Sequence, residues 1–185
     1  MRILAISGSL RRDSHNTALL RAAAQLLPPE VELVLYEGLR DIPPYDDDEH
    51  HAQPASVQRL KQAIAEADAV LVSTPEYNHS IPGQLKNALD WVSRPLISSP
   101  LRNKPAAVVG ASTGMFGAVW AQAEARKVLQ AIGARVLDRE LPVPSADDQF
   151  HPDGRLSDEE TERGLAATIE ELTAAVAERR ERIAA

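Results

Sequence analysis

A polar turn near the start of the chain is the first segment with the residues for ligand chemistry. It spans residues 8–17, follows the apolar run of residues 3–6, and precedes a helix-like pattern. The free backbone N–H groups and the dipole at a helix N-terminus favour an anion there. The segment adds side-chain donors for a phosphate, namely Ser9, Arg11, Ser14, Asn16 and Thr17. The alternative is that Ser14 or Asn16 only caps the helix and that the arginines are solvated.

A second segment, residues 75–83, holds a carboxylate, an aromatic ring and an amide between prolines. The backbone and Asn78 would bond the polar edge of a planar ligand, and Tyr77 would cover an apolar part of it. The alternative is a rigid surface turn in which Glu76 is solvated and Tyr77 packs on the next helix.

A third segment, residues 111–117, is rich in small residues. Gly114 would let the backbone approach a flat ligand closely. An ordinary strand-to-helix turn, with Ser112 or Thr113 as the helix cap, explains the same residues.

Short apolar runs alternate with amphipathic helix patterns along the whole chain. Strands are expected at residues 2–7, 31–36, 69–72, 106–109 and 134–137, and helices at 17–27, 57–67, 84–92, 118–132 and around 165–176. Such alternation is typical of βαβ units in a parallel sheet. We predict one α/β domain over residues 1–185, with a five-stranded, doubly wound sheet in the order 2-1-3-4-5.

In such sheets ligands bind beyond the carboxyl ends of the strands, near the point where the strand order reverses. The three polar segments follow the first, third and fourth strands, so they are expected to meet there. A phosphate site, a clamp for a planar ring and a close-approach glycine together predict a phosphorylated planar heterocycle. FMN is the obvious candidate.

Composition excludes several other classes. The net charge of −7 disfavours nucleic-acid or anionic membrane partners, which need clustered basic residues. There is no cysteine and no apolar run long enough for a bilayer span. With a strand-like start at residues 2–7, a cytoplasmic location is expected. His50 and His51 lack further ligands at helical spacing, so no metal site is expected.

From residue 1 to about residue 143 the chain resembles the NADPH-dependent FMN reductase family, which includes quinone-, azo- and chromate-reducing flavoproteins. The motifs that carry the resemblance are Gly8-Ser9-Leu10-Arg11 with Ser14 and Asn16, and Thr74-Pro75-Glu76-Tyr77-Asn78 continued by Ser80, Pro82-Gly83, Leu85-Lys86-Asn87-Ala88 and Asp90-Trp91. The segment beyond Pro144 carries no motif of this family.

The resemblance implies a flavodoxin-like three-layer sandwich and an enzyme that passes hydride from NADPH or NADH through bound FMN to a small acceptor, by ping-pong kinetics. It implies phosphate and ribityl contacts from Ser9, Arg11, Ser14, Asn16 and Thr17. Ring contacts would come from Pro75, Glu76, Tyr77 and Asn78, and from Ser112, Thr113 and Gly114 on the other side. A homodimer or homotetramer is implied, with the helix containing Trp91 as a candidate interface. Because FMN would perform the redox chemistry, no side chain is assigned as catalytic.

Three other functions stay open. A flavodoxin-like electron carrier would bind FMN without reacting with nicotinamide, a serine hydrolase would use Ser9, and a sensor would bind flavin or NADP without turnover. The hydrolase would need a histidine and a carboxylate beside that serine, and no nucleophile elbow is present. Arg11 and Arg12 are also candidates for the 2′-phosphate of NADPH, and His79 for a proton donor.

Overall fold

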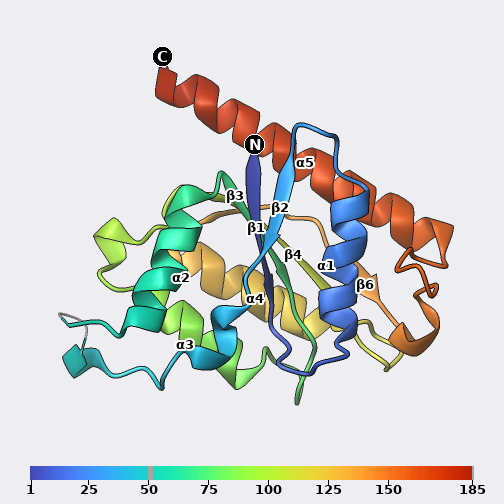
Figure 1. Cartoon of the computed structure of the whole chain (residues 1–185), viewed down its shortest axis with the longest axis horizontal. Coiled ribbons are helices and arrows are strands. Elements are labelled where there is room, and N and C mark those ends of the chain that lie inside the picture. Colours follow the sequence, from blue (N-terminus) through green and yellow to red (C-terminus); the bar gives the residue numbers. More distant parts are fainter. Residues whose placement is uncertain (50–51, 185) are drawn as a thin grey trace.

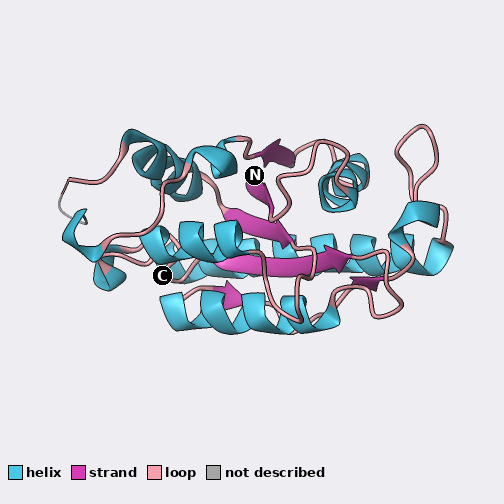
Figure 2. Ribbon diagram, turned by 90° about the horizontal axis from the view of Figure 1, so that it is seen from below, coloured by secondary structure: helices cyan, strands magenta, loops and turns pink. Residues whose placement is uncertain are grey.

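Strands and helices alternate along the chain and assemble into three layers, with a sheet between two layers of helices (Figures 1 and 2). The computed structural model describes residues 1–49 and 52–184, so the expectation for His50 and His51 lies outside the described residues. The strands are β1 (Arg2–Ser7), β2 (Glu32–Leu35), β3 (Ala69–Ser73), β4 (Pro105–Ala111), β5 (Arg135–Val136) and β6 (Pro142–Val143). The α-helices are α1 (His15–Gln25), α2 (Ala55–Glu66), α3 (Gly83–Val92), α4 (Val119–Ile132) and α5 (Glu159–Ala184). Short 3-10 turns lie at η1 (Gly38–Asp41), η2 (Asp47–Glu49), η3 (Leu96–Ser98) and η4 (Ala146–Asp148).

The sheet is parallel and has the order β2-β1-β3-β4-β5, which confirms the predicted order. The edge beside β4 is divided between two short strands. β5 pairs with the start of β4 at Pro105 and Ala106, and β6 pairs with its end at Gly110 and Ala111. The predicted fifth strand is therefore shorter than expected, and β6 lies in a stretch for which the sequence predicted no element.

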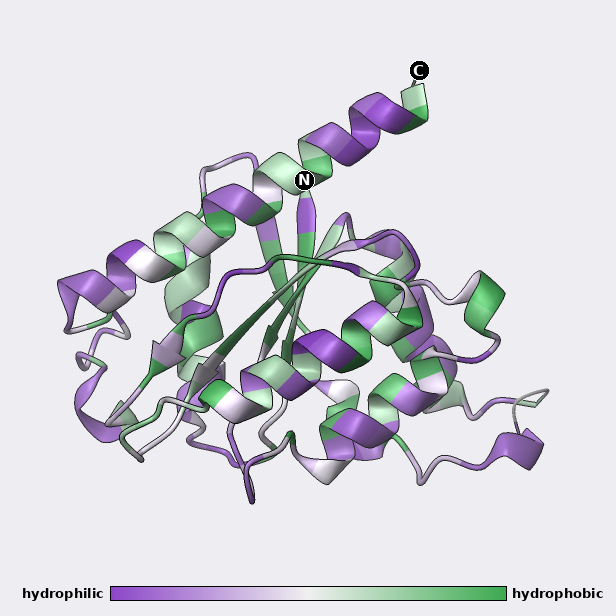
Figure 3. Ribbon diagram, turned by 180° about the vertical axis from the view of Figure 1, so that it is seen from behind, coloured by the Kyte–Doolittle hydropathy of each residue, from purple (hydrophilic) through white to green (hydrophobic). Residues whose placement is uncertain are grey.

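The central strands β1, β3 and β4 are mostly apolar because helices cover both faces of the sheet. Successive strand residues point to opposite faces. In β1, Leu4 and Ile6 enter the core beneath α2, α3 and α4, whereas Ile3 and Ala5 enter the core beneath α1 and α5. β3 and β4 alternate in the same way. Figure 3 shows the resulting hydrophobic strands between amphipathic helices.

The helices confirm the predicted elements, with two informative differences. Trp91 is completely buried and donates from Nε1 to the carbonyl of Pro43 at 2.9 Å. It therefore belongs to the core of its own chain, and an interface role of the helix at residues 84–92 stays a prediction that its exposed residues would have to carry. α5 is longer than its buried face, and its C-terminal end projects past the sheet (Figure 1). Within the described residues, no helix combines the length and apolar character that crossing a bilayer requires.

Candidate functional site

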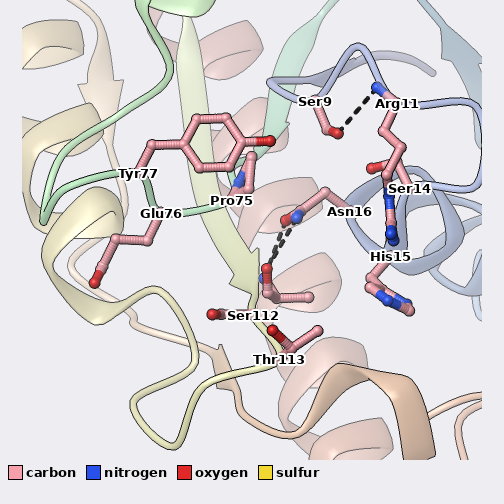
Figure 4. A pocket seen from close by; sticks show the side chains of 11 residues that line it. Ser9, Arg11, Ser14, His15, Asn16, Pro75, Glu76, Tyr77, Ser112 and Thr113 are labelled. Atoms are coloured by element: carbon pink, nitrogen blue, oxygen red, sulfur yellow. Dashed lines mark hydrogen bonds between the residues drawn. The ribbon is translucent and has the colours of Figure 1, made fainter.

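A cavity of about 220 Å³ lies beyond the carboxyl ends of β1, β3 and β4, and we call it the cleft (Figure 4). The parallel sheet places the three loops that follow these strands at one edge. Nine of the twelve predicted site residues line the cleft. The full lining set is Ser9, Arg11, Ser14, His15, Asn16, Pro75, Glu76, Tyr77, Ala111, Ser112 and Thr113.

The other three predicted residues lie close by but do not line the cleft. Thr17 donates from its hydroxyl to Ser7 Oγ at 3.0 Å. Asn78 lies at the tip of the second loop, with φ of 54°. The carbonyl of Gly114 accepts a hydrogen bond from the backbone N–H of Ser145 at 3.3 Å. Flavin contacts stay a prediction for these three residues, as for the nine that line the cleft.

The first loop is held in shape by its own hydroxyls. Ser14 is the N-cap of α1, and its Oγ accepts from the N–H of Thr17 at 3.3 Å. The backbone N–H of Arg11 donates to Ser9 Oγ at 3.3 Å. Arg11 itself is exposed and forms no ion pair with any carboxylate in the described part of the chain. Hydroxyls, a free guanidinium and a helix N-terminus form a donor set suited to a phosphate.

Asn16 connects this loop to the ends of two strands. Its Nδ2 donates to the carbonyl of Ala111 at 2.9 Å, and its Oδ1 accepts from the N–H of Ala111 at 3.0 Å and from Ser73 Oγ at 2.9 Å. The side chain is only 3% exposed. The structure thus gives Asn16 a structural role at the floor of the cleft, beside the phosphate role predicted for it.

The second loop is a tight hairpin that presents an aromatic ring. Tyr77 and Ser80 exchange backbone hydrogen bonds of 3.0 and 3.1 Å, and the two residues between them, Asn78 and His79, have positive φ. Two such residues are the pattern of a type I′ turn. The hairpin holds Tyr77 at the cleft with 54% of the residue exposed, across from Arg11 and Ser14 (Figure 4).

Glu76 connects the second loop to α4. Its Oε2 accepts from the backbone N–H groups of Trp120 and Ala121 at 3.0 and 3.1 Å. A carboxylate at a helix N-terminus is favourable, and the N-cap residue Ala118 has no side chain that could bond those groups. Glu76 lines the cleft as predicted, while its charge caps α4 and so fixes the second and third loops to each other.

His15 is a cleft residue that sequence reasoning left without a partner. Its Nε2 lies 3.0 Å from Asp147 Oδ1, and its ring stacks on Phe150 at a centroid distance of 6.1 Å. Asp147 and Phe150 are in the segment without a family motif. No local signal could identify this contact, because its partners are more than a hundred residues away along the chain.

Comparison with known proteins shows the family of this chain. The family model for NADPH-dependent FMN reductase matches residues 1–148. The chain belongs to the NADPH-dependent FMN reductase family. It is therefore an oxidoreductase with a flavodoxin-like fold, as predicted, and FMN and NAD(P)H are its cofactor and co-substrate.

Individual relatives support the same family. The chain is 40% identical over 174 residues to an NAD(P)H-dependent FMN reductase of Pseudomonas aeruginosa, covering 93% of each chain. It is 35% identical to a 2-hydroxy-1,4-benzoquinone reductase of a Burkholderia species, covering 97% of this chain and 98% of that one. The solved structure of FerB, a flavoenzyme NAD(P)H:(acceptor) oxidoreductase from Paracoccus denitrificans, superposes with a TM-score of 0.84 at 36% identity and covers 96% and 97% of the two chains.

The residues of the cleft fit FMN. The phosphate would bind among the donors of the first loop, and the ring would lie against Pro75 and Tyr77. A Cβ atom built on Gly114 meets only Ser112 Oγ, at 3.5 Å, so packing within the protein does not require a glycine there. Close approach of a ligand supplies a reason for it.

Proposed function

We propose that this member of the family transfers hydride from NADPH or NADH, through FMN bound in the cleft, to a small quinone-type acceptor. The observation that carries this proposal is the meeting of phosphate donors, an exposed aromatic ring and a strand-to-helix turn in one cleft at the switch point between β1 and β3. The names of the relatives, which include FMN and quinone reductases, support the donor and the acceptor class. Free flavins, azo compounds and metal oxyanions are further candidate acceptors.

Bound FMN supplies the hydride and electron chemistry. The chain's own part is to bind, orient and shield. Arg11 and Ser9 would hold the phosphate of FMN, and Pro75 and Tyr77 would hold its ring. We propose that donor and acceptor use the same part of the cleft in turn, which gives ping-pong kinetics. The first hydride step requires no protein acid or base.

His79 does not line the cleft. Its Nδ1 lies 3.5 Å from Glu76 Oε1, and its ring meets Trp120 edge to face at 4.7 Å, with 74% of the side chain exposed. This position does not favour the proton-donor role considered for His79, and we assign no catalytic side chain.

We also propose that the enzyme is a homodimer or homotetramer in the cytoplasm. Beside the cleft, Met115, Phe116 and Trp120 are 75%, 55% and 40% exposed. Only 4% of the residues are aromatic, so a cluster of exposed aromatic side chains is not expected by chance. Such a cluster favours contact with a protein partner. The absence of cysteine is compatible with a reducing compartment.

The decisive experiment follows the visible absorption of the FMN-loaded protein under anaerobic conditions. Addition of NADPH or NADH alone should bleach the flavin, and a quinone added afterwards should restore the colour. Steady-state plots at several quinone concentrations should give parallel lines. An electron carrier or a sensor would keep its oxidised spectrum in the presence of the nicotinamide, and this result would overturn the proposal.

A variant pair tests the cleft itself. Arg11→Ala removes one charge-assisted hydrogen bond to the phosphate, which typically contributes about 1.5–3 kcal/mol. The dissociation constant of FMN should therefore rise by roughly ten- to a hundredfold. Arg163→Ala removes an exposed arginine from α5, away from the cleft, and should leave FMN affinity unchanged.

A further inference from the structure

A second cavity, of about 280 Å³, adjoins the cleft and shares Ser9 and Arg11 with it. It lies between the first loop, the start of α1, and the segment that follows β2. Four arginines line it, namely Arg11, Arg12, Arg21 and Arg40, and we call it the arginine groove. Arg11 and Arg12 come from the first loop, Arg21 from α1 and Arg40 from η1.

The gathering of these guanidiniums is unfavourable for the protein alone. All four residues are exposed, and within the described residues none of them forms an ion pair. Elsewhere, Arg126, Arg139 and Arg180 pair with carboxylates. The only carboxylate that lines the groove is Glu37. Four like charges at one place, in a chain of net charge −7, create a local positive potential that an anion would relieve.

The groove also has a fixed wall and an aromatic side chain. Arg40 donates from Nη2 to the carbonyl of Leu10 at 2.6 Å, which ties η1 to the first loop. Tyr36, which directly follows β2, is partly buried and lines the same cavity. Guanidinium groups beside the ring of Tyr36 suit a nucleotide. Arginine binds phosphate through bidentate hydrogen bonds, and the aromatic ring can contact a base.

We propose that the arginine groove binds the adenosine 2′-phosphate end of NADPH and makes the enzyme select NADPH over NADH. This inference rests on the proposed function, because continuity with the cleft lets one donor molecule place its nicotinamide against the flavin and its other end in the groove. A phosphate monoester carries a charge of about −1.5 to −2 near pH 7, whereas NADH has a neutral hydroxyl at that position. Arg11 is engaged by the phosphate of FMN, which leaves Arg12 and Arg21 as the main ligands of the second anion.

The test measures nucleotide binding by calorimetry to FMN-saturated protein, so that the flavin phosphate site is filled. Adenosine 2′,5′-bisphosphate should bind at least tenfold more tightly than 5′-AMP, and this preference should fall as salt is raised. Arg12→Gln and Arg21→Gln should each reduce the preference several-fold, while Arg163→Gln should retain it. Arg12→Lys should retain only part of the preference, because lysine keeps the positive charge but cannot form the bidentate hydrogen bonds of a guanidinium group.

Equal affinities for the two nucleotides in the wild type would overturn the groove assignment, as would a preference retained by the double variant Arg12→Gln/Arg21→Gln. Both residues are exposed, and circular dichroism checks that the variants fold. If the flavin is bleached equally well by NADPH and NADH and the bisphosphate is not preferred, the groove proposal fails while the proposed function stands. If FMN does not bind or is not reduced, the proposed function fails first.

Discussion

Among single residues, the buried polar side chains of Asn16 and Lys104 form hydrogen bonds between separate parts of the fold. Asn16 lies in the first family motif, yet its amide bonds the backbone at the end of β4 and a hydroxyl at the end of β3. Lys104 is 4% exposed, and its Nζ donates to the carbonyls of Ala65 and Ala67 at the end of α2. Each side chain links segments that are far apart in sequence, and each gives a measurable prediction.

Asn16→Ala should destabilise the protein by about 2–4 kcal/mol. The substitution leaves the N–H and carbonyl of Ala111 and the hydroxyl of Ser73 without their partner, and an unsatisfied buried group costs about 1–3 kcal/mol. Urea unfolding measures the loss. Gln25→Ala, an exposed polar change at the end of the same helix, should stay within about 0.5 kcal/mol of wild type. A loss below about 1 kcal/mol in Asn16→Ala would contradict the structural role.

Lys104 should make stability depend on pH in the alkaline range. Burial, with a smaller contribution from Arg179, lowers the pKa of Lys104 from 10.5 to about 8. Between about pH 8 and 10.5 the Lys104 amine is therefore protonated more in the unfolded chain than in the folded one. Its contribution to the free energy of unfolding rises with pH in this range. Between pH 7 and 9.5 the free energy of unfolding should rise by about 2 kcal/mol relative to Lys104→Met. Parallel pH profiles for the two proteins would refute this.

At the level of elements, the loop after β4 contains two glycines in different surroundings. Packing leaves no room for a side chain at Gly117 but leaves room for one at Gly114. Gly117 has φ of 56°, and a Cβ atom there would lie 2.5 Å from the N of Val143 and 2.7 Å from the carbonyl carbon of Pro142. The close approach lets the chain that enters α4 pass directly against β6. Gly114, three residues earlier, has no such neighbour.

These two glycines should separate folding from flavin binding. Gly117→Ala should destabilise the protein by more than about 2 kcal/mol, because it adds left-handed strain and a backbone clash. Gly114→Ala should leave stability within about 0.5 kcal/mol of wild type and weaken FMN binding. Denaturation curves and FMN titration of both variants make the comparison. An unchanged FMN affinity in Gly114→Ala would remove Gly114 from the predicted site.

At the scale of the whole molecule, charge and apolar surface are unevenly distributed around the cleft. Arginines gather on the side of the first loop, and exposed apolar side chains gather at the start of α4. Phe116 and Trp120 also contact each other, at a ring distance of 4.9 Å. We propose the first surface for the nucleotide donor and the other for a second copy of the chain.

Light scattering during gel filtration should therefore give at least twice the mass of one chain. Phe116→Ser should shift the protein toward monomer, since it places a polar group in the proposed contact. Ile183→Ser changes a side chain that is 71% exposed at the far end of α5, and it should leave the mass unchanged. A wild-type protein that is monomeric at micromolar concentration would refute the dimer.

Much of the fold could be predicted from the sequence, because strand and helix periods are local properties. Continuous apolar runs identified β1, β3 and β4, and Gly133 marked the end of α4, where it adopts φ of 97°. The edge of the sheet could not be predicted, since β5 and β6 contain two residues each and owe their existence to pairing with β4. Segments that short have no period of their own.

The alternation of elements, the family and the three loops of the cleft could be predicted from the sequence, because they depend on patterns and motifs within short segments. What several of those side chains contact depends on tertiary packing and could not be predicted. The contacts of Glu76 with α4, of Asn16 with β4 and of His15 with Asp147 each join residues separated by 44 or more positions. The arginine groove likewise arises where three elements converge. Such contacts depend on which loops come together in the folded chain, and local periodicity does not predict this.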